Sequence, residues 1–261
     1  MLSGQAENFF SESKEAPIAG QALNIMKKSG LSARQDAQAR ADMYAFLAAV
    51  YLRPPTPDLV RHLVAEDFLE ELSSLFGEEI VAELKKFAAD THPDSDFAAL
   101  DQEYMNLFAV PTGRYVTPFE DVYQGQTVEG VLKRGPLLGE RAIAARRIYR
   151  AAGADMDRTC KELPTHIGVE LSYMSFLCER QAAAIRDEEG QALPDGEKRA
   201  AADSVRYRIL QKKFLDEHLN AWFPHLSRSI QANAQSNFYR GLARITEAFL
   251  AYDTAELLGL F

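Results

Sequence analysis

Polar side chains with acid–base or metal-binding chemistry recur every fourth residue between positions 162 and 170. His166 and Glu170 would share one face of a helix, and Glu162 lies four residues earlier. A histidine beside carboxylates can form an acid–base pair or supply half of a metal site. A complete metal site needs three or four ligands at matched spacing, and the remaining histidines follow no such pattern: His62, His92, His218 and His225. The segment therefore predicts a polar cluster at a helix start, without a bound metal.

Sequence signatures of common enzymes are absent from the chain. It contains no glycine-rich phosphate loop ending in Gly-Lys-Ser/Thr, no dinucleotide-binding fingerprint and no Gly-x-Ser-x-Gly elbow. The two cysteines, Cys160 and Cys178, form no CxxC motif and are expected to be small buried or half-buried thiols. These observations predict a protein that is not an enzyme and that carries no cofactor.

Aromatic side chains gather in the segment between positions 103 and 126, EYMNLFAVPTGRYVTPFEDVYQGQ. Prolines at 111 and 118 and glycines at 113 and 125 interrupt any helix there. Aromatic rings in a rigid, non-helical stretch often anchor a partner, although the same rings could fill a gap between helices. The large apolar and aromatic residues of this segment are Tyr104, Leu107, Phe108, Tyr115, Phe119 and Tyr123.

The charge balance restricts the class of partner. Against 29 Lys and Arg stand 38 Asp and Glu, which gives a formal charge of −9. Such a charge repels nucleic-acid phosphates and anionic membranes, so we expect a cationic ligand and excess carboxylates near the aromatic segment and the cluster at 162–170. The basic group Arg141, Arg146, Arg147 and Arg150 is expected to be a solvated helix face that pairs with nearby acids.

The location in the cell is predicted from the absence of a membrane-spanning stretch and of a signal peptide in the sequence. No apolar stretch approaches the roughly 18 residues of a membrane span, and the N-terminus lacks the features of a signal peptide. With only two cysteines, a cytoplasmic protein without membrane insertion is expected.

A helical period of apolar residues runs through most of the chain, and no alternating strand pattern of useful length occurs. Residues 1–38 have few large apolar side chains and are predicted to form a flexible tail. Residues 39–261 are predicted to form one all-α domain of about eight to ten helices. A split at 111–125 stays open, and the polar run 186–198 is expected to be a linker. The expected helices lie at 36–53, 68–76, 81–87, 100–108, 139–153, from Pro164 onward, and at 209–222 and 238–249, the last two separated by Pro224.

The two marked segments, in this order, resemble the TorD/DmsD/NarJ family of cytoplasmic chaperones for molybdoenzymes. The late helix around His218, Leu219, Trp222 and Pro224 is also similar to the family. One position departs from it, because Thr165 stands where the family usually has an aspartate. The residues that carry the resemblance are Glu103, Leu107, Phe108, Pro118, Phe119, Glu120, Tyr123, Glu162, Leu163, Pro164, His166, Ile167, Glu170, Leu171 and Met174.

The resemblance implies a TorD-like chaperone that binds the twin-arginine leader, the apoprotein, or both, of a molybdopterin-dependent oxidoreductase. Such a chaperone assists cofactor insertion and proofreads the client before export. Glu162, Glu120 or Asp121 could replace the missing aspartate electrostatically. A monomer and a domain-swapped dimer both stay open. The implied leader-binding residues are Tyr115, Pro118, Phe119, Glu120, Tyr123, Glu162, Pro164, Thr165, His166 and Glu170.

Two other functions are compatible with the sequence. A nucleotide- or metal-responsive helical protein would bind a small molecule through His166 and Glu170, since anions are favoured at a helix N-terminus. A helical assembly adaptor would use the same fold to bind a folded subunit rather than a leader.

Overall fold

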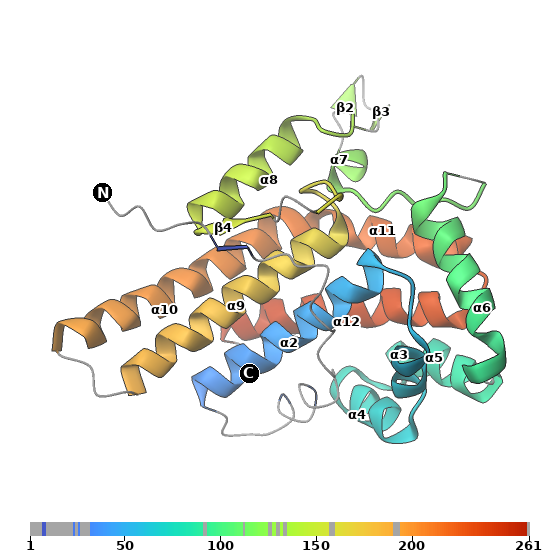
Figure 1. Cartoon of the computed structure of the whole chain (residues 1–261), viewed down its shortest axis with the longest axis horizontal. Helices are drawn as coiled ribbons and strands as arrows, with labels where there is room; N and C mark the ends of the chain where they lie inside the picture. Colours follow the sequence, from blue (N-terminus) through green and yellow to red (C-terminus); the bar gives the residue numbers. More distant parts are fainter. Residues whose placement is uncertain are drawn as a thin grey trace. The chain divides into compact units, whose positions relative to one another are not determined.

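The computed structural model describes residues 7–8, 23, 26, 32–90, 93–111, 113–124, 127–128, 131–132, 135–156, 160–189 and 194–259 (Figure 1). In these residues helices dominate and the strands are only two residues long, so the all-α prediction is confirmed. Most of the predicted tail, 1–38, lies outside the described residues, but residues 7–8 form a strand and residues 33–38 are helical, so the prediction of a flexible tail is wrong for these positions. Among the helices that are described, none combines the length and the apolar character needed to cross a membrane.

Two compact units make up the chain, and each consists of two separate stretches of sequence. Unit 1 contains Met1–Ala49 and Phe119–Leu219, and unit 2 contains Val50–Pro118 and Asn220–Phe261. The domain expected at 39–261 therefore includes parts of both units. Of the segments that carry chemistry, the one at 162–170 belongs to unit 1, whereas the aromatic segment is divided between the units after Pro118.

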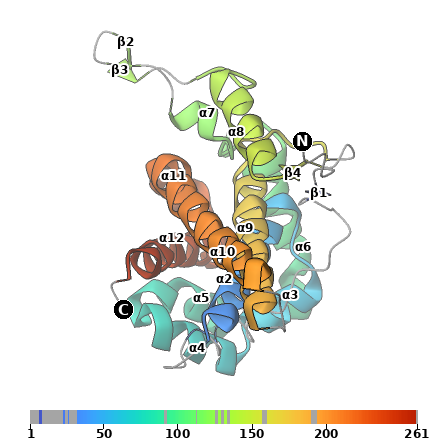
Figure 2. The ribbon, with the colours of Figure 1, turned by 90° about the vertical axis from the view of Figure 1, so that its left-hand side faces the viewer.

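Unit 1 is built on two long helices that pack side by side, α9 (Ile167–Glu189) and α10 (Pro194–Phe214) (Figures 1 and 2). Two pairs of short strands accompany them: β1 (Glu7–Asn8) runs parallel to β4 (Ala154–Asp155), and β2 (Thr127–Val128) runs antiparallel to β3 (Val131–Leu132). The helical elements of unit 1 are α2 (Ala33–Leu52, as far as Ala49), α7 (Glu120–Tyr123), α8 (Glu140–Ala151), α9 (Ile167–Glu189), α10 (Pro194–Phe214) and the π-helical turn η2 (Leu215–Leu219).

A chain of buried polar side chains ties three helices of unit 1 together. Arg40 of α2 donates from Nη2 to Oε1 of Gln211 on α10 at 2.6 Å. Gln211 in turn donates from Nε2 to Oε1 of Gln181 on α9 at 2.9 Å. All three side chains are buried, and these hydrogen bonds replace the hydrogen bonds to water that the polar groups lose on burial. The chain of bonds fixes the register of α2 against the α9 and α10 pair.

Aromatic rings attach α8 to this pair. Tyr149 of α8 packs against Tyr173 of α9 with ring centroids 4.4 Å apart, and Tyr173 meets Phe214 of α10 at 4.9 Å. All three rings are almost fully buried. Such ring pairs add about 0.5–1.5 kcal/mol each beyond the burial of their area. They hold α8 beside the first turn of α9, where the polar site lies.

Unit 2 contains the remaining helices. Gly241 of α12 (Asn237–Leu258) packs so closely against Leu84 of α5 (Glu78–Asp90) that a Cβ at Gly241 would lie 3.0 Å from the Leu84 nitrogen. Glycine therefore permits the close packing of these two helices. The helices of unit 2 are α3 (Pro57–Leu63), α4 (Glu66–Phe76), α5 (Glu78–Asp90), α6 (Pro93–Tyr104), the π-helical turn η1 (Met105–Ala109), α11 (Asn220–Asn233) and α12 (Asn237–Leu258).

Several helix boundaries differ from the predicted ones, and three of them have a clear local cause. α2 begins at Ala33, before the predicted Asp36, because Ser32 and Gln35 form a reciprocal capping pair: the Gln35 N–H donates to Ser32 Oγ and the Ser32 N–H donates to Gln35 Oε1. Pro224 lies inside α11 and does not end a helix, because it follows η2, where the hydrogen-bond register already changes. α9 and α10 occupy most of the expected linker 186–198, where the Glu and Lys residues of their ends favour a helix.

Candidate functional site

The two segments that the sequence marked meet in unit 1, where a short backbone bridge joins them. Phe119 and His166 form an isolated antiparallel bridge, and the Glu120 N–H donates to the Thr165 carbonyl at 2.9 Å. The edge of one ring of this pair faces the other, with the Phe119 and His166 centroids 5.2 Å apart. α7 follows directly after the bridge, so its first residues are positioned by the start of α9.

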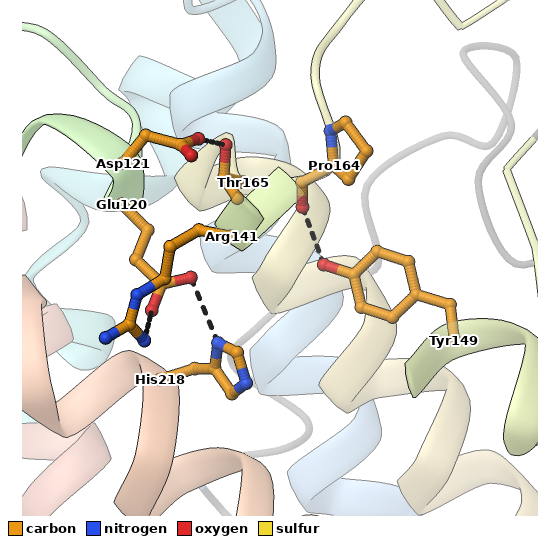
Figure 3. A network of polar contacts seen from close by, with 7 residues as sticks. All are labelled: Glu120, Asp121, Arg141, Tyr149, Pro164, Thr165 and His218. Atoms are coloured by element: carbon orange, nitrogen blue, oxygen red, sulfur yellow. Dashed lines mark hydrogen bonds and ion pairs between the residues drawn. The ribbon is translucent and has the colours of Figure 1, made fainter. Parts of the chain in front are cut away.

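Glu120 is the centre of a buried ion-pair network (Figure 3). Its side chain has no exposed surface, and its two carboxylate oxygens have different partners. Oε1 accepts from Nη1 of Arg141 on α8 at 3.1 Å, and Oε2 lies 3.0 Å from Nδ1 of His218 on η2. The His218 ring stacks on Phe214 with centroids 4.6 Å apart. Glu120 thus links three elements, and its charge is already paired inside the protein.

Thr165, the position that departs from the family, donates its hydroxyl to Oδ2 of Asp121 (Figure 3). Thr165 has no exposed surface and Asp121 is 3% exposed. A buried carboxylate needs hydrogen bonds to replace lost hydration, and the threonine hydroxyl supplies one of them. Of the three carboxylates considered as replacements for the missing aspartate, Asp121 is the one in contact with position 165.

His166 acts as the N-cap of α9. Its Nδ1 accepts a hydrogen bond from the Gly168 N–H at 3.1 Å, and its own carbonyl accepts from the Glu170 N–H at 3.0 Å. The helix therefore begins at Ile167, after the cap, and not at Pro164 as predicted. Burial lowers the pKa of the His166 imidazole to about 3, so the ring is neutral at physiological pH. Its Nε2 lies 3.9 Å from Glu162, close to a carboxylate but without a positive charge to pair with it.

The neutral His166 ring predicts a pH-dependent stability. In the unfolded chain this imidazole takes up a proton below about pH 6.5, whereas in the folded chain it resists protonation down to about pH 3. The free energy of unfolding should therefore fall as the pH is lowered through this window, by about 1.4 kcal/mol per pH unit from this residue. Urea unfolding between pH 6.5 and 4 would show a shallower slope for His166→Asn, because asparagine can cap the helix but does not titrate. Equal slopes for both proteins would contradict the burial argument.

Glu170 lies with Glu120 and His218, although the sequence grouped it with His166. One oxygen or nitrogen from each of these three buried side chains lies within 4.8 Å of the others, so they form a candidate group for a metal ion. The guanidinium of Arg141, already 3.1 Å from Glu120, places a positive charge at the same site. This charge competes with a cation for the Glu120 carboxylate.

Tyr149 connects the network to the segment ahead of α9. Its hydroxyl donates to the Pro164 carbonyl at 2.7 Å (Figure 3). Burial, followed by the nearby Glu170 carboxylate, raises the pKa of this hydroxyl well above its usual range, so Tyr149 remains a hydrogen-bond donor. Tyr149, Arg141 and His218 were not predicted as parts of the site. His218 carried a signal through the similarity of the late helix to the family, and Arg141 through the expectation that its basic group pairs with nearby acids, which its contact with Glu120 confirms.

The ten predicted leader-binding residues differ in accessibility. Within unit 1, Phe119, Tyr123 and Glu162 are half-buried, and the Glu162 side chain is 38% exposed. Tyr115, half-buried, and Pro118, buried, belong to unit 2. The others are buried: Glu120, Pro164, Thr165, His166 and Glu170. In unit 1, a partner would therefore meet the two aromatic rings and Glu162, with the buried residues acting as their support.

A cavity of about 260 Å³ in unit 1, named the α8 groove here, opens beside Glu162. Its charge differs from the expected acidic surface, because three of its charged side chains are arginines and one is a glutamate. The arginines come from the exposed face of α8, while the nearby carboxylates Glu120, Asp121 and Glu170 are buried. The residues that define the groove are Leu138, Ile143, Arg146, Arg147, Arg150 and 162–164. As for the cysteines, Cys178 is buried and Cys160 is half-buried, as predicted.

The fold and the site together define an all-α protein whose two motif segments meet over a buried polar network. Comparison with known proteins identifies the family to which the chain belongs. Residues 70–228, more than half of the chain, match the family described as nitrate reductase delta subunit. The chain belongs to this family, which confirms the resemblance to the TorD/NarJ maturation chaperones.

The matches to three relatives span two thirds or more of each relative's length. The selenate reductase assembly chaperone protein of Thauera selenatis is 28% identical over 153 residues, which are 57% of this chain and 67% of the relative. The perchlorate reductase assembly chaperone protein of Dechloromonas aromatica is 28% identical over 197 residues, 76% of this chain and 75% of the relative. The chaperone protein TorD of Shewanella loihica is 21% identical over 238 residues, 90% of this chain and the whole relative.

Proposed function

We propose that this protein is a cytoplasmic maturation chaperone, and not an enzyme, for a molybdopterin-dependent oxidoreductase. It binds the twin-arginine leader of the catalytic subunit, the apoprotein, or both, and delays export until the cofactor is inserted. The names of the relatives, which are assembly chaperones for selenate and perchlorate reductases, support the chaperone role. The observation that carries the leader-binding part is the bridge between Phe119 and His166, which brings the two family segments together.

The accessible residues at this bridge have the chemistry that a leader needs. A twin-arginine leader has a cationic segment followed by a moderately apolar stretch, so apolar side chains of the leader can cover the half-buried rings of Phe119 and Tyr123. The half-exposed Glu162 carboxylate can attract an arginine and guide its approach. Burial at roughly 25 cal/mol per Å² is enough for micromolar binding, about −8 kcal/mol, after ordering costs.

The test of this function is a titration with leader peptides. The protein should bind the twin-arginine leader encoded beside its gene with saturation, and a Lys-Lys version should bind more weakly, because lysine lacks the planar fork that pairs with carboxylates. Fluorescence anisotropy or calorimetry measures both affinities. If no leader encoded in that neighbourhood shows saturable binding, the leader-binding proposal is wrong.

Within this proposal, Tyr123→Ala should weaken leader binding about tenfold, because one aromatic contact with the apolar stretch is lost. The melting temperature should change little, since the Tyr123 ring is only half-buried. Tyr207→Ala is the matched control: Tyr207 is also a half-buried tyrosine of unit 1, on α10. A loss of stability in Tyr123→Ala with unchanged leader affinity would mean that this ring fills a gap between helices.

The alternative function, a protein that responds to a metal or nucleotide, is favoured by one observation, the approach of Glu120, Glu170 and His218 within 4.8 Å. Metal analysis of the purified protein and melting with added nucleotide distinguish it from the chaperone. A ligand at 100 times its Kd should raise the free energy of unfolding by about 2.7 kcal/mol. Capture of the client with and without its leader distinguishes the leader-binding chaperone from an assembly adaptor. An adaptor should capture both forms, because it binds the folded subunit and not the leader.

A further inference from the structure

The α8 groove combines exposed apolar side chains with positive charge, and nothing in the leader-binding function uses this combination. Leu138 and Ile143 line it and are 64% and 53% exposed, values far above those of ordinary core residues. Leu137, next in the chain to Leu138, is 49% exposed. Exposed apolar side chains gathered at one concave surface indicate a binding site more strongly than the same side chains scattered singly.

The backbone holds Leu138 in this exposed position. Its φ of 62° lies in the left-handed region, which a leucine rarely adopts. Among the described residues, Leu138 is the only non-glycine residue with a positive φ. Next to it, a Cβ at Gly139 would approach the Pro136 carbonyl oxygen to 3.1 Å, so the turn is tightly folded. An unfavourable backbone conformation persists only where the surrounding structure imposes it, and here it accompanies an apolar side chain that is 64% exposed and not part of the core.

The positive charges of the groove are available to a partner. Arg146 and Arg147 lie on the exposed face of α8, and in the described part of the chain neither makes an ion pair. Arg150 lies 3.7 Å from Asp155, in a contact in which both side chains are exposed. Glu162 is the only acidic side chain among the described residues that line the groove. The groove therefore attracts carboxylates and repels a cationic leader.

We propose that the α8 groove is a second docking surface, which binds an acidic amphipathic segment of a protein partner. Leucine-like side chains of the partner fill the space between Leu138 and Ile143, and carboxylates flanking them pair with Arg146 and Arg147. This surface differs from the leader site in the sign of its charge. Glu162 and Pro164 line the groove and also belong to the predicted leader-binding residues. The groove proposal does not depend on leader binding, because it rests on Leu138, Ile143 and the arginines of α8 and on another class of ligand.

Other anionic partners fit the structure less well. The net charge of −9 repels nucleic acids and anionic membranes, and this repulsion opposes their attraction to the three arginines of the groove. A free phosphate would gain nothing from Leu138 and Ile143, and the arginines of the groove are exposed and do not form a closed pocket. An acidic amphipathic peptide uses both properties of the groove at once.

The test uses the full-length protein and a synthetic helical peptide of about 14 residues, in which Leu recurs at every third or fourth position and Glu fills the others. Fluorescence anisotropy should show saturable binding that weakens several-fold between about 50 mM and 500 mM salt. Arg146→Glu/Arg147→Glu should weaken it at least tenfold, and Ile143→Ser should weaken it at both salt concentrations. Lys86→Glu is the control: Lys86 is exposed on α5 of unit 2, and its exchange brings the same change of charge per site with no expected effect.

Several results would overturn the proposal. The first is no saturable binding of the Glu peptide up to roughly 1 mM. The second is equal binding of a peptide with Lys in place of Glu, which would show contact with apolar residues without charge recognition. The third is an unchanged affinity in the double arginine variant, provided that its melting temperature equals that of the native protein. Displacement of the peptide by inorganic phosphate or by phosphatidylserine vesicles would assign the groove to a phosphate or a lipid surface.

Discussion

Replacing Glu103 with alanine should lower the free energy of unfolding by about 3 kcal/mol, the largest loss expected at a motif residue outside the polar site. The Glu103 side chain is buried, and its Oε1 accepts from the N–H groups of Gln235 at 2.5 Å and Ser236 at 2.9 Å. These donors lie in the turn between α11 and α12. A hydrogen bond to a charged acceptor contributes about 1.5–3 kcal/mol, and alanine leaves two partly buried donors unpaired. Urea unfolding measures the loss.

Two control variants separate the charge from the burial. Glu103→Gln keeps an acceptor oxygen and removes the charge, so about half of the loss is expected. Glu70→Ala removes an exposed glutamate from α4 and should change the stability by less than about 0.5 kcal/mol. Glu103 belongs to the family motif, and its contacts give it a structural role. A Glu103→Ala protein with native stability but lost leader binding would refute that role.

Most helices of the fold could be predicted because their apolar period is long and uninterrupted. The stripe that includes Met43, Phe46 and Val50 is buried in α2, as expected. The errors occurred where local patterns compete. Pro224 usually marks a helix end, yet it is accommodated beside the π-helical turn η2. Ser32 and Gln35 form a capping pair that starts α2 earlier than its apolar stripe.

The site was predictable as a pair of segments but not as a network. The spacing of His166 and Glu170 placed them on one face of a helix, but spacing cannot show that His166 is the cap that precedes this helix. The partners of Glu120 come from Arg141 and His218, 21 and 98 residues away, and tertiary packing alone brings them together. The net charge of −9 did not predict the basic groove either, because a net charge does not say where on the surface the charged side chains lie.

The second large loss of stability is expected from a substitution at the contact between Thr165 and Asp121. Thr165→Asp, which restores the residue usual in the family, should lower the free energy of unfolding by about 3 kcal/mol at pH 7. The new carboxylate would lie against Asp121 in a site where neither side chain is exposed by more than 3%. Two buried carboxylates in contact cannot both ionise without a large cost, so they would share one proton. The pKa of one carboxyl would rise in the folded variant, and stability would be lost as the pH rises through that value.

The exchange of both residues tests whether the contact itself determines this effect. Thr165→Asp/Asp121→Thr again places one hydroxyl against one carboxylate, and it should recover at least about half of the loss. Urea unfolding at pH 7 and pH 4.5 distinguishes the causes: the deficit of Thr165→Asp should shrink at the lower pH, whereas a purely steric deficit would stay constant. If Thr165→Asp is as stable as the native protein at pH 7, Asp121 does not take the place of the missing family aspartate. If the variant is destabilised and the exchange restores it, this contact requires one hydroxyl and one carboxylate, and either position can supply the carboxylate.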